Sequence, residues 1–285
     1  MFSFVGMAVR PWRILAELLV ERNSLLHSLR FGWRVLLFVV NTIVCWIGFE
    51  ISLLIHGKKN RLRVINRWVP RWAGINLWIY GVQVEACGPL VESGKLVSGC
   101  DEHGRGRIFI SNHRSGMDIP VVFTTVEAHC ISRHDVANWP LVGRGARRIG
   151  TLFVDRTSQR SGAAVLKEVS HVVERGEAVA MFPEGTAYPG DEVRPFKNGA
   201  FNAAKRSQAQ IVPMAFAYDN EAAYFDTESF MAHIKRLAGL KRLRVAVEIG
   251  TPLCCEGLST PDIRDLAHQH VQMLVHHARA RLVDC

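Results

Sequence analysis

The sequence predicts an α/β fold: a mixed, largely parallel central sheet flanked by helices, with an N-terminal membrane-associated helical segment. Two observations lead to this prediction. After Gly81, apolar runs of strand length alternate with segments of helical periodicity, which is typical of α/β domains. Before Gly81, the chain is apolar, basic and rich in tryptophan. We therefore divide the chain into residues 1–80, predicted to be membrane-docking helices, and residues 81–285, predicted to be the α/β domain.

The N-terminal region carries most of the net positive charge. Residues 1–71 hold 11 Lys and Arg against 3 Asp and Glu, a net charge of +8 out of +9 for the whole chain. Six of the 7 tryptophans lie within the first 80 residues. Tryptophan and basic side chains around an apolar stretch are typical of a membrane–water interface. No nucleic-acid-binding motif accompanies the charge, so we expect a lipid surface as the partner, and no nucleic acid.

Three helical segments are predicted in this region. Residues 11–30 show amphipathic spacing, and residues 62–80 place two tryptophans and two isoleucines on one face, which packs either on the core or in the membrane interface. The apolar run 35–55 is long enough to cross a hydrocarbon core of about 30 Å once. Glu50 within it is costly in lipid, and basic residues flank both ends. Two arrangements fit: a single span, or a monotopic hairpin with both ends on the cytoplasmic face, which we favour.

The α/β region is predicted to contain six strands and four helices. The strands are expected at residues 82–86, 107–111, 150–155, 178–182, 210–217 and 244–249. The helices are expected at residues 117–127, 160–175, 196–206 and 261–282. The polar stretch 92–106 is expected to form an exposed loop. Functional side chains of such folds gather where strands end, so three strand ends are candidates for the site.

The 7 cysteines predict neither a disulfide framework nor a metal site. Their number is odd, they are scattered, and they form no C-x-x-C pair or Cys/His spacing suited to zinc. We expect reduced, mostly buried thiols in a cytoplasmic compartment. No bound metal or cofactor is predicted.

The first strand end is SNHRSGMD, which places His113 five residues before Asp118. One interpretation is a catalytic pair, in which Asp118 orients the imidazole and His113 acts as a general base near neutral pH. The other is a helix cap, because Ser115 and Asp118 have the spacing of a capping box. No serine or cysteine nucleophile motif accompanies the pair. As a base, His113 would therefore take its proton from the substrate's own hydroxyl, in a direct transfer without a covalent enzyme intermediate.

Two further strand ends carry polar side chains. In VAMFPEGTAYPG, Glu184 could bind substrate hydroxyls, and the turn at Gly185 and Thr186 exposes backbone N–H groups to anions; a plain polar turn is the alternative. In GTLFVDRTS, Arg156 could hold a phosphate through two parallel hydrogen bonds, unless it pairs on the surface with the neighbouring Asp155. Both stretches therefore suit an anionic or hydroxyl-bearing substrate.

Taken in order, these segments resemble the 1-acyl-sn-glycerol-3-phosphate acyltransferase family of glycerolipid acyltransferases. The family's motifs are matched as follows: N-H-x-x-x-x-D at residues 112–118, G-x-x-F-x-D-R at 150–156, F-P-E-G-T at 182–186 and a V-P strand at 212–213. PFKNGAF, residues 195–201, is similar to the family's P-F-K-x-G-A-F, and Arg133 stands where a lysine is common. The resemblance covers roughly residues 65–255, and four ordered motifs are a far more specific signal than one.

The resemblance implies a fatty acyltransferase that needs no metal or cofactor. His113 would deprotonate the acceptor hydroxyl for attack on an acyl thioester, and Asp118 would orient His113. The implied substrate-binding residues are Arg156, Arg133 and Lys197 for an acceptor phosphate, with Glu184, Gly185 and Thr186 for positioning the acceptor. The donor would be acyl-CoA or acyl carrier protein, and the expected acceptor is 1-acylglycerol 3-phosphate, which would give phosphatidic acid. Bacterial members of the family carry an N-terminal membrane-docking helical segment, as expected here.

One departure from the family pattern concerns the acceptor. Phosphatidate-forming members usually have Arg-Ser after F-P-E-G-T, whereas this sequence has Ala187 and Tyr188, so an expected anion-binding arginine is missing. The acceptor could therefore be another lysolipid, such as lyso-ornithine lipid. A protein that binds membrane lipid without catalysis is the alternative of a different class.

Overall fold

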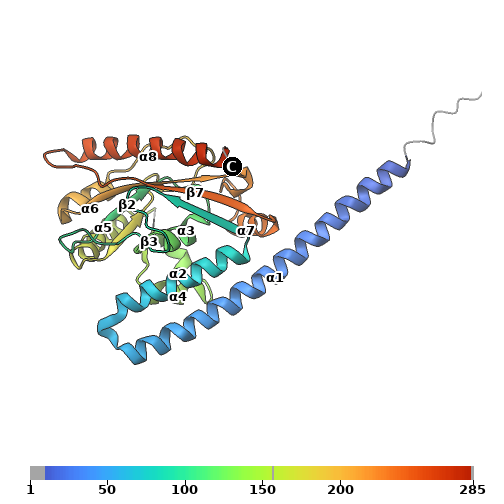
Figure 1. Ribbon diagram of the computed structural model, residues 1–285, viewed down its shortest axis with the longest axis horizontal. Coiled ribbons are helices and arrows are strands. Elements are labelled where there is room, and N and C mark those ends of the chain that lie inside the picture. The colour runs from blue at the N-terminus through green and yellow to red at the C-terminus, as the bar shows by residue number, and fades with distance from the viewer. Residues whose placement is uncertain (1–9, 156, 284–285) are drawn as a thin grey trace, which may run out of the picture.

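The computed structural model describes residues 10–155 and 157–283, and within them seven strands form one sheet (Figure 1). The order across the sheet is β1-β7-β6-β2-β5-β3-β4. The strands are β1 (Val82–Cys87), β2 (Ile108–Ser111), β3 (Ala128–Arg133), β4 (Leu152–Val154), β5 (Ala178–Met181), β6 (Ile211–Tyr218) and β7 (Leu243–Ile249).

Five neighbouring strands of the sheet run in the same direction. β2 pairs in parallel with both β5 and β6, and β3 pairs in parallel with β5 and β4. β7 is antiparallel to β6, and β1 is parallel to β7. The prediction of a mixed, largely parallel sheet is therefore confirmed. Because parallel strands end at the same edge, the carboxyl ends of β6, β2, β5, β3 and β4 meet there.

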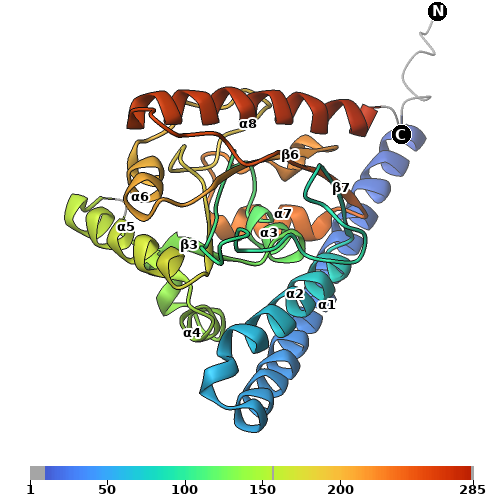
Figure 2. The same cartoon turned by 60° about the vertical axis from the view of Figure 1, so that its left-hand side comes forward.

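Helices cover both faces of the sheet (Figures 1 and 2). The described chain contains α1 (Arg10–His56), α2 (Arg61–Ile79), α3 (Asp118–Thr125), α4 (Val142–Arg148), α5 (Gln159–Glu174), α6 (Gly199–Ser207), α7 (Phe230–Gly239) and α8 (Thr260–Val283). Alternate residues of β2 show the two layers. Ile108 and Ile110 pack in the core beneath α5, α6 and α8, whereas Phe109 packs in the core beneath α2, α3 and α7.

The N-terminal region forms a helical hairpin of α1 and α2, joined by the short 3-10 helix Lys58–Asn60 (Figure 2). The two segments predicted at 11–30 and 35–55 are one continuous helix, because no glycine or proline signal strong enough to end it lies between them. The hairpin is closely packed at Gly48, where an added Cβ would come within 2.2 Å of the Trp68 ring. The indole N–H of Trp68 donates to the Ser52 hydroxyl at 2.8 Å.

The predicted apolar face of α2 is divided between different surroundings. Trp68 and Trp72 pack against α1, and Trp72 donates to Thr42 Oγ1 at 3.0 Å. Ile79 is buried in the core, whereas Ile75 is exposed. The face was predicted to pack either on the core or in the membrane interface. Neither describes the whole face, because its tryptophans pack on a third surface, that of α1.

Three elements, β3, α4 and α7, were not among those expected from the sequence. The strands and helices that were predicted for the α/β region are present, with ends shifted by a few residues. The strand expected at 150–155, for example, is the shorter β4. The stretch 92–106 is largely exposed, as expected, although Val97 is buried and forms an isolated bridge with Val126.

Candidate active site

His113 and Asp118 form a hydrogen-bonded pair where β2 ends and α3 begins. His113 Nδ1 lies 2.6 Å from Asp118 Oδ2, and the Asp118 side chain is fully buried. The same oxygen accepts the backbone N–H groups of Arg114 at 2.7 Å and Ser115 at 3.0 Å. The Asp118 carboxylate therefore accepts hydrogen bonds from the loop that precedes α3. The spacing from Ser115 to Asp118 is that of a capping box, but the carboxylate binds residues upstream of its own helix.

Tyr218, at the end of β6, completes the surroundings of Asp118. Its hydroxyl donates to Asp118 Oδ1 at 2.6 Å, so both carboxylate oxygens are hydrogen-bonded. Burial, together with the charge of Asp118, raises the pKa of Tyr218 well above its usual value. The phenol therefore stays protonated and remains a donor.

The ring of His113 is oriented on two sides. Nδ1 faces Asp118, and the ring stacks on Phe182 with a centroid separation of 4.3 Å and an interplanar angle of 21°. A carboxylate on Nδ1 fixes the proton there and leaves Nε2 as the nitrogen that can take a proton. The side chain is 14% exposed, so it is partly open to a substrate. This geometry is that of an oriented general base.

Asn112 fixes the point at which β2 turns into this loop. Its side-chain amide donates to the carbonyl of Phe216 at 2.9 Å, and its side-chain oxygen accepts the Phe216 N–H at 2.8 Å. The buried amide thus continues the ladder between β2 and β6 by one step. Because the Asn112 side chain, rather than its backbone, makes these hydrogen bonds to β6, the backbone can turn away from the sheet at His113.

Glu184, at the end of β5, is turned inward onto Arg114. Arg114 Nη1 donates to both carboxylate oxygens at 3.1 and 2.9 Å, and the two side chains are almost completely buried. Burial raises the pKa of Glu184 to about 7, and the guanidinium opposes that rise. Binding of acceptor hydroxyls by Glu184 stays a prediction, since its contact in this structure is Arg114.

Arg114 was not predicted to be a site residue, although it lies inside the first motif. Its guanidinium also donates to the carbonyls of His113 at 2.7 Å and Glu192 at 2.8 Å. It therefore joins the loop after β2 to the loop after β5. The available signal was a long cationic residue between His113 and a run of small residues, but the sequence gives no indication that its partner is Glu184, 70 residues away.

Gly185, Thr186 and Lys197 lie together beyond β5. Gly185 has φ +84°, and a Cβ there would come within 2.6 Å of Lys197 Nζ. The Lys197 N–H donates to the Pro183 carbonyl at 3.0 Å, and Thr186 is exposed. A glycine at position 185 therefore lets the ammonium group approach the turn, which places a positive charge near the end of β5.

Of the two predicted arginines, Arg133 ends β3 and Arg156 lies outside the described residues. Arg133 binds Asp135 through two hydrogen bonds, of 2.9 and 2.5 Å, and is 57% exposed. Its register partner on β4 is Val154, so the ends of β3 and β4 are adjacent. Asp155 accepts the N–H and hydroxyl of Thr157.

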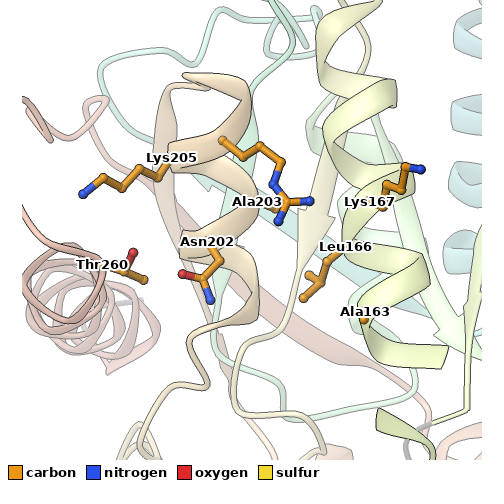
Figure 3. Close-up of a pocket in the computed structure, with 8 residues that line it drawn as sticks. Ala163, Leu166, Lys167, Asn202, Ala203, Lys205 and Thr260 are labelled. Atoms are coloured by element: carbon orange, nitrogen blue, oxygen red, sulfur yellow. The ribbon is translucent and has the colours of Figure 1, made fainter. Parts of the chain in front are cut away.

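A separate groove of about 520 Å³ lies between α5 and α6 (Figure 3). Leu166 points from α5 toward α6, Asn202 lies on α6, and Lys167 and Lys205 extend outward (Figure 3). Its lining residues include three basic side chains and no acidic one. None of the predicted site residues lines this groove, so it is distinct from the His113 site.

Comparisons with known proteins agree with this fold. Residues 96–217 match the model of the family described as Acyltransferase. The chain is 27% identical to the lyso-ornithine lipid O-acyltransferase of Pseudomonas aeruginosa over 172 residues, 58% of this chain and 66% of that protein. It is 26% identical to the 1-acyl-sn-glycerol-3-phosphate acyltransferase of Neisseria gonorrhoeae over 153 residues, 52% of this chain and 60% of that protein. These matches span less than two thirds of each relative's length.

The solved structure of PlsC, the 1-acyl-sn-glycerophosphate acyltransferase of Thermotoga maritima, has the same fold. It superposes with a TM-score of 0.69 at 18% identity and covers 91% of this chain and 97% of its own. Residues 96–217 therefore resemble the Acyltransferase family, and the described chain has the fold of PlsC.

Proposed function

We propose that this protein is a membrane-associated O-acyltransferase that moves a fatty acyl group from a thioester to the free hydroxyl of a lysolipid. The observation that carries the proposal is the 2.6 Å contact between His113 Nδ1 and the buried Asp118. His113 Nε2 takes the proton of the acceptor hydroxyl as its oxygen attacks the thioester carbonyl. The carbon–sulfur bond breaks, an ester forms, and the proton passes to the departing thiolate. Asp118 stabilises the imidazolium between these steps.

The surroundings of His113 favour direct transfer to the acceptor. Its ring contacts Asp118 and Phe182, whereas the neighbouring Ser115 hydroxyl accepts the Met117 N–H at 3.2 Å. The serine beside the base is therefore engaged with the backbone. The nucleophile in this mechanism is the acceptor's own hydroxyl, and the donor is acyl-CoA or acyl carrier protein.

The expected acceptor is 1-acylglycerol 3-phosphate, which would give phosphatidic acid. Lys197 beside Gly185 supplies one positive charge near the end of β5, and Arg133 supplies another at the end of the neighbouring β3. Arg156, which lies outside the described residues, is a further phosphate ligand expected from the sequence. A phosphate dianion is bound best by several such groups. The name of the Neisseria relative supports the same acceptor.

Lyso-ornithine lipid is a second candidate, favoured by how few cations are free in the described part of the site. Arg114 is bound to Glu184 and Arg133 to Asp135, and Ala187 stands where an arginine was expected. A zwitterionic head group needs less positive charge than a phosphate dianion. The name of the Pseudomonas relative supports this candidate.

The membrane partner is supported by α1. Leu26–His56 is long and apolar enough to cross a bilayer, and much of its apolar surface is exposed. Glu50, however, accepts two hydrogen bonds from Arg148 of α4 at 2.8 and 2.7 Å. A helix with one side fixed to the folded domain and the other apolar fits a monotopic position, with the domain on the cytoplasmic face, better than a span.

Product analysis by mass spectrometry tests the proposal. Purified protein would be offered a panel of lysolipids, including 1-acylglycerol 3-phosphate and lyso-ornithine lipid, with acyl-CoA and with acyl carrier protein as donors. We expect an acylated product from at least one pair and none with His113→Ala. Tight lysolipid binding without release of thiol from either donor would instead identify a lipid-binding protein.

A further inference from the structure

The catalytic loop, defined as residues 113–118, is held by a buried histidine of α7. His233 is fully buried, and its Nε2 accepts the N–H of Gly116 at 3.0 Å, with the Ser115 hydroxyl 3.4 Å away. A ring nitrogen that accepts an N–H carries no proton, so the ring proton is on Nδ1, which lies 3.2 Å from Glu228 Oε1. Neutral His233 therefore joins the catalytic loop to α7.

His233 has little freedom to move. The rings of Phe225 and Phe230 pack around it, with centroids 5.0 and 6.5 Å from that of the imidazole. Burial, together with the charge of the nearby Arg236, lowers the pKa of His233 to about 4. The ring is therefore neutral at neutral pH and stays able to accept the Gly116 N–H. Any shift of α7 is transmitted to the backbone of the catalytic loop through this hydrogen bond.

The C-terminal end of α7 is held by α1. The last carbonyl groups of a helix have no partner within it. Here Arg34 Nη1 donates to the carbonyls of Ala238 at 2.9 Å and Leu240 at 2.7 Å, and its side chain is 4% exposed. A cation at this end is also favourable to the helix dipole. The two helices approach closely, since a Cβ on Gly239 would come within 2.5 Å of the His27 ring.

The same stretch of α1 carries exposed apolar side chains. Trp33 is 45% and Leu36 is 62% exposed, although Arg34 between them is buried. A lipid surface that binds these side chains therefore also fixes the position of Arg34. A continuous set of contacts runs from that surface through Arg34, α7 and His233 to the catalytic loop.

We propose that α7 couples the N-terminal helix to the catalytic loop, with Arg34 and His233 as positioning residues, so that binding of α1 to lipid fixes the geometry of His113 and Asp118. This inference rests on the proposed acyl transfer. Its structural part, the ordering of the loop by α1, can be measured without turnover.

The first test uses His233. His233→Phe removes the acceptor of the Gly116 N–H, so we expect kcat to fall at least tenfold while KM for both substrates stays within about twofold. His233→Gln retains a side-chain acceptor, so we expect it to recover most of the lost kcat. Equal loss in the two variants, with both folded, would show that the hydrogen bond does not position the loop.

The second test is a double-mutant cycle with Arg34. Arg34→Met should lower kcat several-fold, with Arg34→Lys intermediate because an ammonium retains the charge. If both residues act through α7, the Arg34→Met, His233→Phe double variant should be little worse than His233→Phe alone. Multiplication of the two single effects would overturn the coupling. Lys235→Met, which removes an exposed cation from α7, is the matched control and should leave kcat unchanged.

The third test measures hydrogen exchange of peptides that contain residues 113–118. Vesicles of phosphatidylethanolamine and phosphatidylglycerol should slow exchange there in the wild type, less in Arg34→Lys and not in Arg34→Met. Loop exchange in the folded Arg34 variants that equals that of the wild type, both without vesicles and with them, would overturn the inference. Loss of the proposed function is distinguished from this outcome, because it would appear as wild-type protein that orders its loop on vesicles but transfers no acyl group.

Discussion

The loops after β2 and β3 both place a cationic or basic side chain beside a carboxylate, but in different surroundings. After β2, His113 contacts Asp118, which is fully buried and accepts four hydrogen bonds. After β3, Arg133 contacts Asp135, and their side chains are 57% and 38% exposed. A buried carboxylate with both oxygens hydrogen-bonded keeps one geometry, whereas an exposed ion pair is screened by water and can change partners. The first loop is therefore suited to chemistry and the second to binding.

Of the changes to these two loops, removal of the base His113 should have the largest effect on activity. We expect His113→Ala to lower the rate of thiol release by about 10²- to 10⁴-fold, the usual contribution of a general base. The protein should remain folded, because the side chain has one hydrogen bond and one stacking contact. His134→Ala, an exposed histidine in the loop after β3, is the control and should keep nearly full activity. Near-normal turnover of His113→Ala would exclude the mechanism.

A change at Asp118 should affect both activity and stability. Asp118→Asn keeps the size of the side chain but replaces one accepting oxygen by an NH₂ group. We expect kcat to fall about 100-fold and the melting temperature to drop, because that NH₂ group must face either Tyr218 or the donors on Oδ2. Asp135→Asn should change neither quantity appreciably. An Asp118→Asn variant with the kcat of the wild type would show that His113 needs no orienting carboxylate.

The buried pair of Arg114 and Glu184 should be sensitive to removal of one partner. Arg114→Met leaves a buried carboxylate without its cation, which costs about 3–5 kcal/mol of unfolding free energy. Adding Glu184→Gln should recover part of that loss. Chemical denaturation of the wild type and of the two variants measures these unfolding free energies. A double variant no more stable than Arg114→Met would show that the stability of this region does not depend on charge pairing.

The pH dependence of stability should report on the same pair. The pKa of Glu184 is raised from 4.5 to about 7 by burial, so the folded protein binds more protons than the unfolded chain between these values. Its contribution to stability is therefore greatest below pH about 4.5 and is lost as the pH rises through about 7. Glu184→Gln removes this pH-dependent contribution to the unfolding free energy. Denaturation curves from pH 5 to 8 should show a smaller decline for Glu184→Gln than for wild type; equal slopes would contradict the assignment.

The smallest effect is expected at Arg133. An exposed ion pair contributes about 0–1 kcal/mol, so Arg133→Gln should leave the unfolding free energy nearly unchanged. KM for 1-acylglycerol 3-phosphate should rise a few-fold, and KM for lyso-ornithine lipid should change less, because only the former carries a phosphate dianion. Steady-state kinetics with each acceptor would measure both KM values. Equal changes for both acceptors would mean that Arg133 does not distinguish the head groups.

The sequence predicted the sheet and the loop of His113 and Asp118, because strand periodicity and motif spacing are local signals. The contacts that give this loop its geometry are long-range. Tyr218 reaches Asp118 across 100 residues, and His233 reaches Gly116 across 117. No local pattern identifies such partners, since each is an unremarkable aromatic or polar residue in its own segment.

The three unexpected elements differ in how visible they were. α7 begins after Ser229, whose hydroxyl accepts the N–H of Ala232, so an N-cap signal was present in the sequence. β3 mixes His129 and Arg133 with its apolar residues, which hides its alternation. α4 contains two glycines and three arginines in seven residues, so its helix is stabilised by packing rather than by propensity.

The pairing of β1 with β7 has a consequence for biosynthesis. Val82 pairs with Leu243, so one edge of the sheet closes only when most of the chain has left the ribosome. The helix α1 emerges long before α7, the element that Arg34 contacts. Throughout that interval the part of α1 around Arg34 lacks its α7 partner. Capture of the nascent α1 by lipid would shield it from aggregation while the remaining strands are synthesised.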